Sequence, residues 1–280
     1  MIEIVERGAV RELRLARPPA NALSPELMAA LTAALAQAAA EAAEPVPASA
    51  PAAAASGRRV AALVLSGAPG MFSAGLDVPY LLTLDRAGIR VMWNNLYALL
   101  RTLAASPLPV VAAITGHSPA GGAVLALHCD ARVMADGDFR IGLNEVRVGL
   151  PLPPVIFAAM RRLVGPRQAE RMCVSGALVL PAEAARIGLV DEVVPADQAV
   201  ERAAAIAAEL AALPRAAMTA TRRLARADLV AMYDDAGDQH AAAGRAAEIE
   251  SVLDSWFSVE AQATMRSLVE RLARKRAAAG

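Results

Sequence analysis

Two features lie close together in the segment Pro119–Gly149, and both are suited to activating a carbonyl group. Gly121 and Gly122 precede an apolar run with helical character. Backbone N–H groups at a helix start, with no Cβ in the way, can face an anion. Glu145 follows in a mostly apolar stretch, where loss of water would raise the pKa of its carboxyl toward the range useful for proton transfer. The segment therefore predicts one acid–base group and one N–H site for an oxyanion.

Both features also have ordinary structural interpretations. A pair of glycines before a helix commonly allows a tight turn or close helix packing, and a single glutamate near glycines is commonly solvated. A second small-residue turn, Gly70–Asp77, follows an apolar run and can present the backbone N–H of Ala74 to a ligand, or can be a plain loop. The residues alone leave these alternatives open.

The elements around these turns indicate an α/β domain. Residues 2–16 alternate enough for two strands joined at Arg7-Gly8, and Ser24 followed by Pro25 predicts a helix start. Two continuous apolar runs, Val60–Leu65 and Leu108–Ile114, are typical of strands buried on both faces of a sheet. Because they alternate with helical patterns, such as the one over residues 85–105, we expect the site at strand ends and helix starts.

The chain becomes mostly helical after Gly149. Helical patterns over residues 236–256 and 259–276 complete the C-terminal third. In the last one an apolar stripe must pack on a docking surface or on a neighbouring subunit, and it comprises Val259, Ala263, Leu268, Val269 and Leu272. An Ala- and Pro-rich stretch, Glu44–Gly57, predicts a flexible surface loop.

Composition excludes several classes of function. The 28 basic and 28 acidic residues cancel, so the chain has no electrostatic footprint for nucleic acid or an anionic membrane. Cys129 and Cys173 form no CxxC motif, and the three histidines have no metal-ligand spacing, so we expect buried free thiols and no metal. No apolar run reaches the roughly 18 residues of a membrane span, and a strand pattern at the N-terminus leaves no room for a signal peptide. These points predict a soluble cytoplasmic protein.

Several segments together resemble the crotonase (enoyl-CoA hydratase/isomerase) superfamily: PPANALSPEL, FSAGLDV, AAITGHSPAGGAVLALHCDARVMAD, IGLNEVRVGLP and SGALVLPAEAARIGLVDEVVP. Within it, IGLNE and the tail SWFSVEAQATMRSLVERL are most similar to the mitochondrial-type Δ3,Δ2-enoyl-CoA isomerases. The resemblance implies a crotonase-like ββα spiral core over residues 1–200 and a helical C-terminal trimerisation region over residues 201–280. It also implies a homotrimer or a dimer of trimers.

The resemblance implies a site as well. Two backbone N–H groups that hold the thioester oxygen would fall on Ala74 and Gly121, and the catalytic carboxylate on Glu145. Hydratases carry a second glutamate, and Val124 stands in its place here. Hydration needs a second polar group to hold water, and valine accepts no hydrogen bond. Residues expected to line the substrate site are Leu76, Val124, Leu143 and Asn144.

These expectations favour isomerisation of 3-enoyl-CoA to trans-2-enoyl-CoA in fatty-acid β-oxidation. One base can remove the acidified proton from C2 and return it to C4, with acyl-CoA as substrate and no cofactor. The alternatives are an enoyl-CoA hydratase, a dienoyl-CoA isomerase, and a non-catalytic CoA-binding scaffold.

Overall fold

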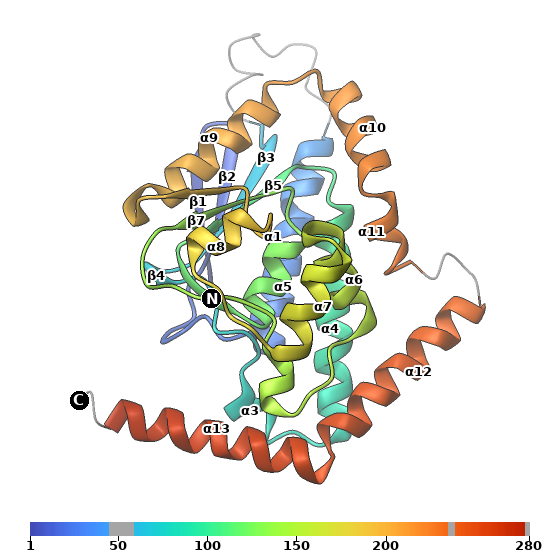
Figure 1. Cartoon of the computed structure of the whole chain (residues 1–280). Helices are drawn as coiled ribbons and strands as arrows, with labels where there is room; N and C mark the ends of the chain where they lie inside the picture. The colour runs from blue at the N-terminus through green and yellow to red at the C-terminus, as the bar shows by residue number, and fades with distance from the viewer. Residues whose placement is uncertain (45–58, 235–238, 278–280) are drawn as a thin grey trace.

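The computed structural model describes residues 1–44, 59–234 and 239–277 of the 280-residue chain (Figure 1). The predicted loop Glu44–Gly57 lies outside the described residues except for Glu44, as does the beginning of the helix predicted from residue 236. Within the described part the α/β architecture is confirmed, with a mainly parallel sheet and a helical C-terminal third.

A six-stranded sheet forms the centre of the molecule. Its strands, in spatial order, are β1 (Ile2–Arg7), β2 (Val10–Leu15), β3 (Ala62–Ser66), β5 (Val110–Ile114), β7 (Ala131–Ala135) and β9 (Glu192–Val194). The predicted hairpin β1–β2 is antiparallel, and every other pair is parallel. Every residue of β3 and β5 is buried, because helices cover both faces of the sheet.

Helices of different size cover the two faces. On one face α9 (Ala199–Ala211) packs against β2, β3, β5 and β7, where Ala203 and Ala207 allow a close approach. On the other face α1 (Pro25–Ala43) and α4 (Arg86–Ala105) contribute to the larger core (Figure 1). The predicted start of α1 is confirmed, since the Ser24 hydroxyl accepts a hydrogen bond from the Leu27 N–H over 3.3 Å.

A second, small parallel sheet was not predicted. It consists of β4 (Gly70–Met71), β6 (Gly116–Pro119) and β8 (Ile141–Gly142). These strands have two to four residues each, too few for an alternating pattern. The sheet matters because α5 (Gly121–Leu127) begins just after β6, and the 3₁₀-helix η1 (Glu145–Val148) follows β8.

The remaining helices follow η1, apart from one short helix before α4. They are α3 (Val78–Leu81), α6 (Pro154–Val164), α7 (Pro166–Ser175), α8 (Pro181–Arg186), η2 (Ala196–Gln198), α10 (Arg215–Ala225), α11 (Ala227–Ala231), α12 (Gln239–Trp256) and α13 (Val259–Ala277). In the described part of the chain no single helix is long and apolar enough to span a membrane; the pair 196–211 and 215–225, bent by 111°, meets that test only together.

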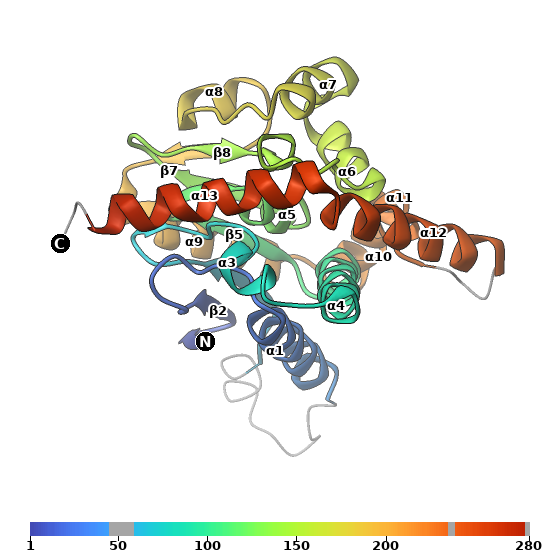
Figure 2. The same cartoon turned by 90° about the horizontal axis from the view of Figure 1, so that it is seen from below.

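Helix α13 crosses the end of the molecule at which α3 lies and packs on α3 and η1 (Figure 2). The predicted apolar stripe of α13 is only partly covered within the single chain. Ala261 and Met265 are fully buried, Leu268 and Val269 are half-buried, and Val259 is 89% exposed. Within the chain the contact is made by the small residue Ala261, which fits against the backbone of Gly149.

Candidate active site

Glu145 is the first residue of η1 and its carboxyl group is largely buried. Its Oε2 atom has no hydrogen-bond partner among the described residues. Burial raises the pKa of Glu145 to about 7, although its own backbone N–H acts in the opposite direction. The turn is fixed by the Leu150 N–H, which donates to the Glu145 carbonyl over 3.1 Å. A carboxyl group with this pKa can both take up and release a proton near neutral pH.

Two helices pack against the 3₁₀-helix that carries Glu145. Helix α7 packs on η1 and contributes Cys173, whose pKa is raised to about 11 by burial and, secondly, by the charge of Glu145. That thiol therefore stays neutral near pH 7. Helix α13 also packs on η1, and a Cβ on the following Gly149 would lie only 2.9 Å from the Ala261 Cα.

The start of α5 supplies one backbone donor. The Gly121 N–H has no hydrogen-bond partner among the described residues, while the preceding Ala120 N–H donates to the Gly142 carbonyl over 2.8 Å. Ala120 has φ 47° and ψ −120°, a conformation that residues with a Cβ rarely adopt. A Cβ on Gly122 would lie 2.5 Å from the Ser73 carbonyl oxygen. Both interpretations of the glycine pair therefore hold. The pair allows close packing, and it leaves the N–H of Gly121 without a partner among the described residues.

The turn that contains Ala74 differs from the prediction. The Ala74 N–H donates to the Ala20 carbonyl over 2.9 Å, so it is already engaged and does not face a ligand. Two residues later, the Leu76 N–H has no hydrogen-bond partner in the described chain. Gly75, with φ +85°, brings this turn so close to α5 that a Cβ on it would lie 3.0 Å from the Gly121 nitrogen. At this junction the N–H groups of Leu76 and Gly121 belong to the two turns that approach each other, and neither has a partner among the described residues.

The other predicted lining residues have different environments. Val124 and Leu143 are each 1% exposed and belong to the core, and Leu76 is half-buried beside it. Asn144 precedes Glu145, and its Oδ1 atom is buried without a partner among the described residues. His117 has a structural role, because its Nδ1 accepts a hydrogen bond from the Arg140 N–H over 3.1 Å.

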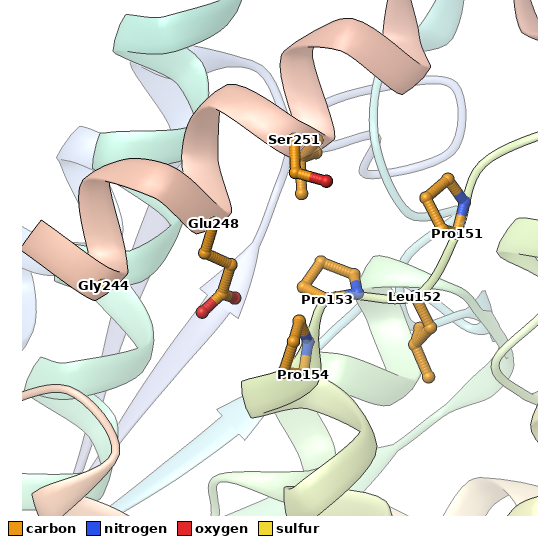
Figure 3. A pocket seen from close by; sticks show the side chains of 8 residues that line it. Pro151, Leu152, Pro153, Pro154, Gly244, Glu248 and Ser251 are labelled. Atoms are coloured by element: carbon orange, nitrogen blue, oxygen red, sulfur yellow. The ribbon is translucent and has the colours of Figure 1, made fainter.

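A pocket of about 460 Å³ lies beyond Leu150, between the segment 151–154 and helix α12 (Figure 3). The carboxylate of Glu248 points toward Pro153 and Pro154, and the Ser251 side chain lies on the same side of α12 (Figure 3). The Tyr97 hydroxyl donates to Glu248 Oε1 over 2.9 Å. The lining is mostly apolar and comprises Pro151, Leu152, Pro153, Pro154, Gly244, Glu248, Ser251 and Val252. Sequence reasoning did not find this pocket, because its two walls are about 100 residues apart in the chain.

The described residues contain no group of three or more His, Cys, Asp or Glu side chains placed to hold a metal ion. The site instead has the parts that proton removal next to a carbonyl requires: a buried base with its pKa near 7 and two free backbone donors. Parts of this kind suit an acyl compound whose carbonyl oxygen gains negative charge.

The sequence model of the family described as "Enoyl-CoA hydratase/isomerase" matches residues 6–273, and the chain belongs to this family. It is 34% identical to the mitochondrial enoyl-CoA delta isomerase 1 of Mus musculus over 81% of this chain and 73% of the mouse protein. It is 33% identical to a probable enoyl-CoA hydratase of Mycobacterium avium over 85% of this chain and 84% of that protein. The crystal structure of human mitochondrial Δ3-Δ2-enoyl-CoA isomerase superposes with a TM-score of 0.85 at 28% identity, covering 98% of both chains. The predicted superfamily, its crotonase fold and the likeness to the isomerases are thus confirmed.

Proposed function

We propose that this protein isomerises 3-enoyl-CoA to trans-2-enoyl-CoA, a step of fatty-acid β-oxidation, without a cofactor. The observation that carries the proposal is the single buried carboxyl group of Glu145, with its pKa near 7 and an unpartnered Oε2. The buried Val124 stands where a hydratase would have its second carboxylate. A reaction that needs one base fits this site better than one that also needs a second group to hold water.

In the proposed mechanism the thioester oxygen accepts hydrogen bonds from the N–H groups of Leu76 and Gly121. Glu145 removes a proton from C2, and the electron pair delocalises over the thioester and the neighbouring double bond as a dienolate. The protonated Glu145 then returns the proton to C4, and the double bond moves to C2–C3. In general each oxyanion donor contributes about 3–4 kcal/mol, and a positioned base contributes roughly 10²–10⁴-fold in rate.

The acyl chain would extend into the pocket between α12 and the segment 151–154 (Figure 3). Apolar walls favour an alkyl chain because burial removes its surface from water. The pocket begins directly after Leu150, which is hydrogen-bonded to the Glu145 backbone. The proposal is supported by this closeness along the chain between the pocket lining and the turn that carries Glu145.

Hydration of 2-enoyl-CoA is the second candidate, favoured by Asn144. Its Oδ1 and the Oε2 of Glu145 are both buried acceptors without partners in the described chain, and a water molecule has two hydrogens to donate. Incubation with 3-enoyl-CoA and, separately, with 2-enoyl-CoA distinguishes the two. Formation of the conjugated thioester absorbance from the first substrate supports isomerisation, and loss of that absorbance from the second indicates hydration.

We also propose that residues 201–280 form a trimerisation region, as a homotrimer or a dimer of trimers in the cytoplasm. Helix α10 has no buried residue, and Leu224 on it is 80% exposed. Such an exposed apolar side chain on a helix without a fully buried residue suits a subunit interface. Light scattering after size-exclusion chromatography gives the oligomeric mass, and a monomer would contradict the proposal. Cell fractionation tests the location.

A further inference from the structure

The segment 17–24 is hydrogen-bonded along its length to the turn that carries the Leu76 N–H, although about 50 residues separate them. The Leu23 N–H donates to the Gly75 carbonyl over 2.7 Å, and the Asp77 N–H donates to the Leu23 carbonyl over 3.1 Å. The Ala74 N–H donates to the Ala20 carbonyl, and the Gly75 N–H donates to the Ser73 hydroxyl over 3.2 Å. From 74 to 77, Leu76 alone keeps an N–H with no partner in the described chain.

Asn21 is the centre of this contact. Its side chain is almost fully buried, and its Oδ1 accepts the Arg17 N–H over 2.9 Å. Its Nδ2 donates to the carbonyls of Met71 and Phe72, over 3.3 and 3.1 Å. The Asn21 carbonyl in turn accepts the Ser73 hydroxyl over 2.8 Å. The Asn21 side chain thus joins the segment 17–24 to the turn. The Ser73 hydroxyl connects the Asn21 carbonyl to the Gly75 N–H.

The backbone conformation points to the same place independently. Among the described residues only two non-glycine residues have a positive φ: Asn21 at 50° and Ala120 at 47°. Ala120 directly precedes the donor Gly121, and Asn21 holds the turn of the donor Leu76. Such conformations cost free energy and persist where the surroundings enforce them, which occurs preferentially at functional sites.

We infer that Asn21 and Ser73 are positioning residues that aim the Leu76 N–H at the thioester oxygen, an inference that rests on the proposed function. The turn contains Gly75 at φ +85°, and glycine adopts many conformations, so the turn does not fix the direction of this N–H by itself. The Leu23 N–H, bonded to the Gly75 carbonyl, orients the peptide unit that carries the Leu76 N–H, and the hydrogen bonds of Asn21 and Ser73 hold the two segments in the position that makes this bond. Neither side chain touches the reacting atoms.

Ser106 provides a matched control for Ser73. Its hydroxyl donates to the Leu108 carbonyl over 2.8 Å and accepts the Leu108 N–H over 3.2 Å, the same two lengths as at Ser73. Both serines are buried. Ser106 precedes β5 at its amino end, whereas the donors follow the carboxyl ends of β3 and β5. Ser73→Ala therefore removes two hydrogen bonds in the donor turn, and Ser106→Ala removes two equivalent hydrogen bonds away from the site.

The experiment compares Ser73→Ala, Asn21→Gly and Ser106→Ala in the full-length protein. Asn21→Gly keeps the positive φ and removes only the side chain. With a 3-enoyl-CoA we expect kcat to fall about 10–100-fold in the first two variants, with KM within about threefold, because a misaimed donor weakens transition-state binding. Ser106→Ala should lose thermal stability but not kcat. Equal kcat in all three variants, or losses that follow only the melting temperature, would overturn the inference.

Acetoacetyl-CoA gives a second readout that needs no turnover. Its enolate resembles the dienolate and absorbs in the ultraviolet, so the enolate fraction on binding reports the oxyanion donors. The wild type should form it, and Ser73→Ala and Asn21→Gly should form less of it. If the wild type forms this enolate but isomerises no 3-enoyl-CoA, the proposed function is refuted. The enolate fractions of the variants, compared with that of the wild type, then still test the positioning role of Asn21 and Ser73. A wild type that does neither refutes both.

Asn21→Asp covers the case in which Asn21→Gly does not fold. The aspartate keeps the acceptor for the Arg17 N–H but cannot donate to Met71 and Phe72 when it is ionised. We expect a loss of kcat like that of Asn21→Gly, and the ratio of variant to wild-type kcat should rise at low pH, because protonation of the aspartate restores a donor. Unchanged kcat and enolate fraction in this variant and in Ser73→Ala would overturn the inference.

Discussion

The Ala120 N–H donates to the Gly142 carbonyl over 2.8 Å. Ala120 directly precedes the donor Gly121, and Gly142 lies three residues before Glu145. This bond therefore joins the start of the donor helix α5 to the strand that leads to the base. It is part of the pairing of β6 with β8, so the small sheet sets the relative position of oxyanion donor and carboxylate.

Activity should depend on pH through the ionisation of Glu145. The base acts as a carboxylate, and burial raises the pKa of Glu145 to about 7. We expect kcat/KM to rise with pH through about 7 and to level off above about 8. The Cys173 thiol, with its pKa raised to about 11, does not contribute a second base in this range. A flat profile between about pH 6 and 8 would contradict the assignment of Glu145.

Glu145→Gln should abolish isomerisation, leave acyl-CoA binding nearly unchanged and stabilise the fold at alkaline pH. Because its folded-state pKa is raised, ionisation of Glu145 destabilises the protein as pH rises from about 4.5 to 7, and the loss is complete above about 8. This shift corresponds to about 3 kcal/mol, which the glutamine variant avoids. Denaturant unfolding at about pH 5 and 8 measures it. Glu260 is exposed, so Glu260→Gln is the control and should show no gain in the free energy of unfolding. Equal stability of Glu145→Gln and the wild type at about pH 8 would contradict the burial of a charge at Glu145.

Ala120→Gly should raise stability and lower kcat. Glycine adopts the φ and ψ of this position freely, so relief of strain should outweigh its greater entropy in the unfolded chain and give about 1 kcal/mol. The freed backbone aims the Gly121 N–H less well. Thermal unfolding checks the gain, with exposed Ala220→Gly in α10 as a control that should lose about 1 kcal/mol. A loss at both positions would mean that Ala120 is not strained.

Gly122→Ala should destabilise the protein by about 1–3 kcal/mol, because the new Cβ would lie 2.5 Å from the Ser73 carbonyl oxygen. Backbone atoms cannot yield as a flexible side chain does. Gly244→Ala in α12 adds the same methyl group where no atom lies within 4 Å, and it should stabilise that helix by about 0.5–1 kcal/mol. Chemical denaturation of both variants measures the difference; similar effects would refute close packing at Gly122.

Ser251→Trp should shorten the accepted acyl chain, because its ring would fill the pocket beside Pro151. We expect kcat/KM for 3-dodecenoyl-CoA to fall at least about tenfold, and that for 3-hexenoyl-CoA to change little. Ser251→Ala removes the hydroxyl without filling space and should resemble the wild type. Equal losses for both chain lengths would place the acyl chain elsewhere.

Local patterns in the sequence determined the elements whose signals are short-range. The hairpin at Gly8, the cap at Ser24 and the apolar strands β3 and β5 all follow from neighbouring side chains, and the structure confirms them. The motifs likewise identified the family. The sequence indicates Glu145 as the base because an acidic side chain in a buried apolar stretch loses contact with water. Its raised pKa agrees with this loss of water.

The tertiary structure alone decided which backbone N–H groups are free. Ala74 and Leu76 are both apolar residues beside Gly75, and no side-chain pattern distinguishes them. Ala74 is engaged because the carbonyl of Ala20, more than 50 residues away, accepts its N–H. The burial of Ala261 is similar, since it depends on a contact with Gly149, which is distant in the chain. A backbone hydrogen bond carries no side-chain signature, so its distant partner appears only when the chain is folded.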